Sequence, residues 1–171
     1  MNKPTDRTVF QNAWVVDDLE AACMKWVREM GIGPFFISDY DNVFEDMTYR
    51  GEPAPLNMTV ALAQAGPVQI ELIQPKVDRC AYRDSVPAGQ MGFHHVCVWT
   101  HDIEQDTAYF ESLGYPAANI GRVGTTHFAY YDTRPLMGCM LEVVSRNEGT
   151  EARFAEIARA AEHWDGTDPL R

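Results

Sequence analysis

Four polar residues stand where strand-like segments of this 171-residue chain would otherwise bury apolar side chains. Glu71 lies at the centre of Val-Gln-Ile-Glu-Leu-Ile, and Glu142 at the centre of Cys-Met-Leu-Glu-Val-Val. Gln11 and His95 each lie near the start of an apolar, β-branched segment. A charge on a buried strand face is costly unless it is paired or binds a metal. Each glutamate alone could equally point to solvent, because alternation does not show which face is buried.

An internal repeat groups the four residues into two pairs. Aligning Gln11 with His95 also aligns residues 69–72 with residues 140–143, so that Glu71 falls on Glu142. Each half then has one polar residue early in its first strand and one glutamate in its last strand. Rigid strands that bring such donors together are what a metal site needs. Imidazole and carboxylate donors suit zinc, nickel, cobalt, manganese or iron.

The elements that would position these residues follow the same order in both halves: strand, helix, strand, strand, strand. Apolar alternation and turn residues predict strands in the first half, and helical spacing predicts one helix. The strands are expected at 9–16, within 35–49, at 56–65 and at 68–74, with the helix at 19–30. In the second half the strands are expected at 93–100, 118–123, 127–132 and 139–145, with the helix at 103–113.

The predicted fold is α+β, with two tandem βαβββ modules forming a cupped mixed β-sheet with flanking helices. Module 1 covers about 8–75 and module 2 about 92–146, within a single domain of residues 1–171. Residues 76–91, with mixed charge and no periodicity, are expected to be a linker or surface loop. An amphipathic C-terminal helix is expected at about 152–164. The modules could pair within one chain or across a dimer.

The charge balance excludes several classes of partner. The formal net charge is −11, whereas nucleic-acid binding needs a basic footprint and anionic membranes attract cations. No apolar run approaches the roughly 20 residues of a membrane span, and residues 1–7 have no apolar signal-peptide core, so we expect a cytoplasmic protein. The four cysteines form no CxxC pair and are expected to be buried free thiols.

Four segments together resemble the vicinal oxygen chelate superfamily, which includes glyoxalase I, methylmalonyl-CoA epimerase, extradiol dioxygenases and bleomycin-resistance proteins. They are residues 11–19, 69–75, 92–98 and 138–143, within a resemblance that covers about 9–146. The resemblance implies that Gln11, Glu71, His95 and Glu142 bind a divalent metal. This donor set looks like one that holds zinc in glyoxalase I enzymes, which favours zinc. His94 is predicted to alternate to the face opposite His95 and is assigned to packing or the surface, although a one-residue register change would exchange it with His95.

The resemblance also implies an activity: a metal-dependent lyase, isomerase or epimerase that transfers a proton next to a carbonyl through a metal-stabilised enolate. Glu142 is the candidate catalytic base, the substrate is a small carbonyl compound, and a homodimer is expected. The sequence Glu-Leu-Ile-Gln-Pro at 71–75 looks epimerase-like, although the epimerase usually has histidine where this chain has Gln11. A glyoxalase I-like lactoylglutathione lyase is an alternative, but Val15 and Pro75 replace the arginine and asparagine that bind glutathione there. A non-catalytic binding or resistance protein on the same fold is the other alternative.

Four aromatic residues are candidates for the substrate pocket. Phe35 and Tyr40 belong to an aromatic group in the first half, and His127 and Tyr131 lie on a predicted strand of the second half. Such aromatic groups more often form core than a pocket, and the sequence leaves both interpretations open.

Overall fold

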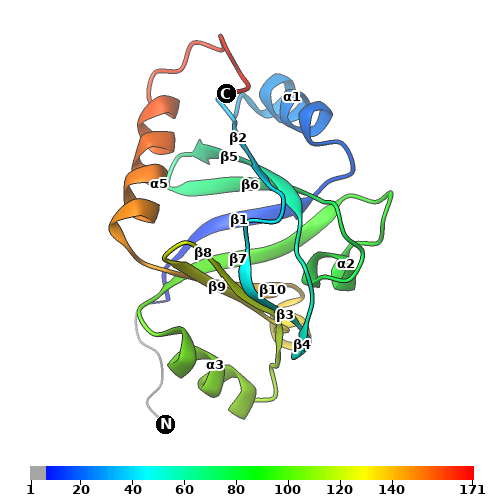
Figure 1. Cartoon of the computed structure of the whole chain (residues 1–171). Helices are drawn as coiled ribbons and strands as arrows, with labels where there is room; N and C mark the ends of the chain where they lie inside the picture. Colours follow the sequence, from blue (N-terminus) through cyan, green and yellow to red (C-terminus); the bar gives the residue numbers. More distant parts are fainter. Residues whose placement is uncertain (1–6) are drawn as a thin grey trace.

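The computed structural model describes residues 7–171 and contains one curled sheet of ten strands with helices around it (Figure 1). Along the described residues the strands are β1 (Val9–Val15), β2 (Phe36–Tyr40), β3 (Glu45–Tyr49), β4 (Glu52–Pro53), β5 (Met58–Ala65), β6 (Val68–Pro75), β7 (Gly92–Thr100), β8 (Ala117–Val123), β9 (Thr126–Tyr131) and β10 (Met140–Ser145). The helices are α1 (Leu19–Met30), α2 (Ala81–Ser85), α3 (Ile103–Ser112), α4 (Arg134–Met137) and α5 (Glu148–Ala161). The α+β fold predicted from the sequence is confirmed.

The strand order shows the internal repeat directly. The sheet reads β2-β5-β6-β1-β7-β10-β9-β8-β3-β4. Four strands from each half follow the equivalent order, and β3 and β4 of the first half are the two additional strands at one edge. Within each half the first and last strands are parallel neighbours, β1 with β6 and β7 with β10. β1 and β7 pair antiparallel and join the halves, so the two modules pair within one chain.

The segment 35–49 divides between the two edges of the sheet. β2 pairs with β5 in its own half, whereas β3 crosses the molecule and pairs with β8 of the second half. β4 extends that edge by pairing with β3. A hairpin that belongs to the first half in sequence therefore completes the sheet of the second half.

The segment 76–91 connects the two modules, and residues 87–91 are exposed, but its middle part is not the surface loop that its composition indicated. It contains α2, and Cys80, Ala81 and Tyr82 have no exposed surface. The Tyr82 hydroxyl is hydrogen-bonded to the Tyr130 hydroxyl at 2.8 Å. A helix of five residues gives no periodic signal in the sequence, because it is too short to repeat an apolar position.

The helices α1 and α3 cover one face of the sheet. Asp18 caps α1 by accepting a hydrogen bond from the Ala21 backbone, and Asp102 caps α3 by accepting one from Gln105. The apolar residues of α1 pack on Ile70 and Leu72 of β6, while Phe110 of α3 packs with Leu141 and Val143 of β10. In strands the side chains alternate between faces, so Glu71 and Glu142, set between these residues, project to the opposite, inner face.

The helix α5 lies beside β5, on the side of the sheet away from α1 and α3 (Figure 1). It starts at Glu148, earlier than expected, because Asn147 and Thr150 form a reciprocal capping box. After α5 the chain returns to β2, where the Phe35 backbone N–H donates to the Pro169 carbonyl. Among the described residues, no helix has the length and apolarity needed to cross a membrane.

Candidate metal centre

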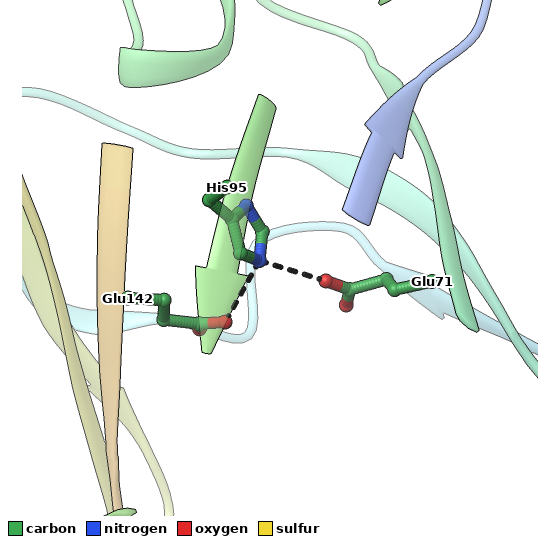
Figure 2. A group of neighbouring side chains, drawn as sticks. All are labelled: Glu71, His95 and Glu142. Atoms are coloured by element: carbon green, nitrogen blue, oxygen red, sulfur yellow. Dashed lines mark ion pairs between the residues drawn. The ribbon is translucent and has the colours of Figure 1, made fainter. Parts of the chain in front are cut away.

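Three ionisable side chains meet on the inner face of the sheet (Figure 2). His95 Nε2 lies 3.2 Å from Glu71 Oε2 and 3.0 Å from Glu142 Oε2. One donor atom from each residue lies within 4.8 Å of the other two. The residues come from β6, β7 and β10, far apart in sequence, so only the folded sheet brings them together.

Two β-bulges set the direction of the inward side chains. Where β1 pairs with β7, the register shifts once at Phe10, next to Gln11, and once at His94, next to His95. A bulge places two residues opposite one and re-aims a side chain, and bulges are common next to active sites. Because Phe10 and His94 occupy equivalent positions in the repeat, each half turns its first polar residue inward by the same device.

The electrostatics of the cluster are those of a proton shared between two carboxylates. Burial alone would lower the pKa of His95, but Glu142 and Glu71 together outweigh it and raise the pKa to about 9. Burial raises the pKa of Glu71, with a further contribution from the Glu142 charge, while His95 opposes the rise. In the absence of an ion, His95 is therefore an imidazolium at neutral pH.

The cluster fits a metal ion better than it fits this proton. Although the ion-pair distances are short, His95 Nε2 and Glu71 Oε2 are buried atoms without a well-aligned hydrogen-bond partner in the described protein. Both atoms face the same point between the residues (Figure 2). Buried polar atoms that lack partners are rare and call for an explanation such as an ion. One imidazole and two carboxylates form a donor set used by zinc and related divalent metals.

Gln11 adjoins the cluster as the fourth predicted donor. It lines the same cavity, is only 4% exposed, and its Nε2 donates a 2.6 Å hydrogen bond to Gln69 Oε1. With the Gln11 amide in this orientation, its carbonyl oxygen is free to serve as a donor atom to a metal. The structure therefore brings three of the four predicted metal-site residues, Gln11, Glu71 and Glu142, to the lining of one cavity. The fourth, His95, is fully buried behind them and contacts both glutamates.

His94 is buried, but not on the face opposite His95 as simple alternation indicated. Its Nδ1 lies 2.8 Å from His95 Nδ1, and its Nε2 lies 3.0 Å from the Ala81 carbonyl oxygen. The carbonyl can only accept, so His94 Nε2 carries a hydrogen. Burial, with His95 beside it, lowers the pKa of His94 to about 3, and the neutral ring must then accept at Nδ1. His95 therefore donates from Nδ1, which leaves Nε2 as the site for a metal.

The cavity above the cluster has a volume of about 260 Å³. Tyr40 lines it, as predicted, but the other three pocket candidates lie elsewhere. Phe35 is fully buried in the core with α1, because it precedes β2 and packs on the covered face of the sheet. Tyr131 packs against Phe110 on that covered face, and His127 is exposed near the start of β9.

Tyr130, rather than Tyr131, faces the cavity. Glu142 pairs with Tyr130 across β9 and β10, so the two side chains share the inner face, whereas Leu141 pairs with Tyr131. The pairing register is the information that the sequence lacked, since a shift of one residue exchanges the two faces. Other apolar residues of the wall are Phe44, Met58, Leu62, Phe128 and Phe154.

Cys97 was also missed as a neighbour of the site. It lies opposite Gln11 on β1 and opposite Glu142 on β10, and it is 1% exposed. Burial, followed by the hydrogen-bonded Glu142 carboxylate, raises the pKa of the Cys97 thiol well above its usual range. All four cysteines are buried free thiols, as predicted, and the Cys97 thiol donates to the Val98 carbonyl oxygen at 3.7 Å.

Comparisons with solved structures show the same fold in enzymes. Methylmalonyl-CoA epimerase from Mycobacterium tuberculosis matches with a TM-score of 0.54 and 16% identity, over 84% of this chain and 91% of that chain. A Streptomyces coelicolor methylmalonyl-CoA epimerase variant in complex with 2-nitronate-propionyl-CoA matches with a TM-score of 0.57 and 17% identity, over 83% of this chain and 96% of that chain. A hypothetical protein from Bacillus halodurans C-125 matches with a TM-score of 0.57 and 16% identity, over 84% and 97%.

Comparison of the sequence identifies a family but no individual curated protein. No curated protein matches the chain. One family model matches residues 10–131, which include Gln11, Glu71 and His95 and end before Glu142. With this match over most of its length, the chain belongs to the Glyoxalase/Bleomycin resistance protein/Dioxygenase superfamily.

Proposed function

We propose that the protein is a metal-dependent enzyme that moves a proton to and from the carbon next to a carbonyl group, with an epimerase-type reaction favoured. The observation that carries this proposal is the Glu71–His95–Glu142 cluster at the base of a largely apolar cavity. The epimerases with the same fold support it. A cavity with a few convergent polar groups is the usual form of a small-molecule site.

Gln11, Glu71, His95 and Glu142 would hold the ion, and the donor set favours zinc among the divalent metals. When bound, the ion acts as a Lewis acid toward the carbonyl oxygen and stabilises the negative charge that develops there. The protein supplies orientation: Gln69 holds the Gln11 amide, and His94 holds the His95 ring.

Glu142 is the proposed base. Its carboxylate lines the cavity, and its side chain keeps 11% of its surface accessible, so a substrate carbon can approach it. The carbon–hydrogen bond breaks, the proton goes to a Glu142 oxygen, and the electron pair moves toward the carbonyl oxygen. Glu71 lies on the other side of His95 (Figure 2) and would serve the opposite face of the substrate, as epimerisation needs.

Deuterium exchange tests this proposal. Protein reconstituted with zinc, cobalt, nickel or manganese is incubated in D₂O with methylmalonyl-CoA and with simpler acyl thioesters, and exchange is followed by NMR. We expect Glu142→Gln to lower the exchange rate by about 10²–10⁴-fold while the fold is retained. Exchange at the unchanged rate in this variant would remove Glu142 from its role.

A non-catalytic binding protein is the second candidate, because protonated His95 can neutralise the two carboxylates without an ion. It predicts ligand binding that is unaffected by chelators. Loss of ligand binding after chelation, with recovery on adding zinc, would exclude it.

We also propose a homodimer. Phe93 is 41% exposed and packs on Trp14, and Met91 beside it is 60% exposed, which leaves an apolar area at the joint of the two modules. Light scattering after size-exclusion chromatography should give twice the chain mass, and Phe93→Asp should reduce it to the monomer mass. A monomer in the unaltered protein would contradict the proposal.

A further inference from the structure

Arg153 is the one cation among the described residues that line the cavity, whose other charged members are Glu71 and Glu142. It projects from α5, which lies outside the residues matched by the family model. A divalent ion would cancel the two carboxylates, and neutral His95 would add no charge. Arg153, whose partner Glu156 is not part of the lining, then gives the residues that line the loaded cavity a net charge of +1, in a chain whose overall charge is −11. A cavity of this charge favours a monoanionic ligand.

Arg153 lies at one end of a row of residues that leads across the sheet to Glu71. Its guanidinium lies over the Phe36 ring, 5.0 Å from the centroid. Phe36 pairs with Leu62, and Leu62 pairs with Glu71, so the three residues form one row across adjacent strands. Two strand spacings separate the backbone of Phe36 from the backbone of Glu71, a distance of about 10 Å.

Arg153 is available to a ligand. Its Nη1 donates a 3.0 Å hydrogen bond to Glu156, but the two side chains are 38% and 55% exposed. An ion pair this exposed contributes little and exchanges readily with an incoming anion. The helix itself is held in place, since Phe154 packs on Phe10 and the Asn147 cap anchors its start.

We propose that the substrate is a small carbonyl acid whose carbonyl group lies at the metal centre and whose carboxylate is bound by Arg153, with an apolar body between them. This inference rests on the proposed function and specifies its substrate class. The wall between the two ends is apolar, with Leu62, Phe128 and Phe154. The volume of about 260 Å³ is below the ~300–1,000 Å³ of drug-sized pockets, so the body is short.

A series of hydroxamates tests the inference, because a hydroxamate chelates zinc through two neighbouring oxygens. Each compound carries a terminal carboxylate on a chain of two to eight methylenes, and each is matched by its uncharged methyl ester. Binding to zinc-loaded protein is measured by calorimetry. For at least one chain length the acid should bind about tenfold more tightly than its ester, as expected for a charge-assisted pair with arginine.

Two variants test whether Arg153 causes the preference for the acid over its ester. Arg153→Met keeps the stem on Phe36 and should abolish the difference between acid and ester while leaving ester affinity unchanged. Arg159→Met removes the same charge from an exposed position on the same helix and should leave the preference intact. Acid and ester binding equally in the unaltered protein, or a preference that survives Arg153→Met, would overturn the inference and leave the metal centre standing. Failure of zinc and of every hydroxamate to bind would instead overturn the proposed function, and this inference with it.

Discussion

The two halves of the molecule each hold one inward-facing donor side chain in place, but they do so with different supporting residues. Each turns a donor inward beside a bulge, Gln11 next to Phe10 and His95 next to His94. In the first half the support comes from the neighbouring strand, where Gln69 holds the amide. In the second half the bulge residue itself, His94, holds the ring. The repeat therefore conserves the geometry of the backbone, while the chemistry of each support depends on whether the donor is an amide or an imidazole.

The largest effect is expected when the donor of the second half, a histidine, is replaced by glutamine, the donor of the first half. His95→Gln should lower zinc affinity by more than about 100-fold, a larger loss than removing a residue that only supports a ligand. It removes the one nitrogen donor of the cluster and leaves Glu71 and Glu142 facing each other. Competition with a chromophoric chelator measures the affinity. An affinity within a few-fold of the original would mean that His95 is not a ligand.

The shifted pKa values of His94 and His95 predict that the free energy of unfolding of the metal-free protein depends on pH. The pKa of folded His95 is about 9 against an ordinary 6.5, so the native state holds its proton more tightly. The stabilisation that this proton gives to the folded state is complete below pH 6.5 and is lost as the pH rises to 9. Its loss lowers the free energy of unfolding by at most about 3 kcal/mol. His94, with a pKa of about 3, acts in reverse and reduces stability as the pH falls below 6.5.

Urea unfolding of chelator-treated protein at several pH values measures this effect. His95→Gln should flatten the decline between pH 6.5 and 9, and it should also weaken the decline on the acid side, because the His95 charge contributes to the low pKa of His94. An equally steep alkaline decline in the variant would assign it to other groups.

The hydrogen bond that His94 accepts from His95 should raise the affinity for zinc by about 10–100-fold. His94→Leu removes the acceptor for His95 Nδ1–H, whereas His94→Gln can accept that hydrogen and still donate to the Ala81 carbonyl. The leucine variant should therefore lose affinity and the glutamine variant should recover most of it. In zinc-loaded protein, nitrogen NMR should show hydrogen on His95 Nδ1. Equal losses in both variants would indicate a packing role only.

The corresponding change in the first half should be the mildest. Gln69→Leu frees the Gln11 amide to rotate, and we expect a loss of zinc affinity of less than about tenfold. Gln64→Leu, on β5 and outside the cavity, is the matched control. If Gln69→Leu weakened zinc binding as much as His95→Gln, the two halves would not differ as described.

The same contrast explains what the sequence could predict. Periodicity and the repeat located the strands with Gln11, Glu71, His95 and Glu142, because polar residues inside apolar strands stand out. The repeat could not show the crossing of β3 to β8 or the burial of Tyr82, because both depend on contacts between distant segments. Tyr131 was preferred to Tyr130, and His94 was placed opposite His95, because pairing register and bulges are set by the assembled sheet.

The most direct test of the central claim is the metal content of the protein beside a Glu71→Gln/Glu142→Gln double variant. Both proteins are dialysed against zinc, then against buffer, and analysed for metal, with circular dichroism as the control for folding. We predict about one equivalent of zinc in the unaltered protein and almost none in the folded double variant. No zinc in the unaltered protein, or equal zinc in both, would contradict a metal centre formed by Glu71, His95 and Glu142.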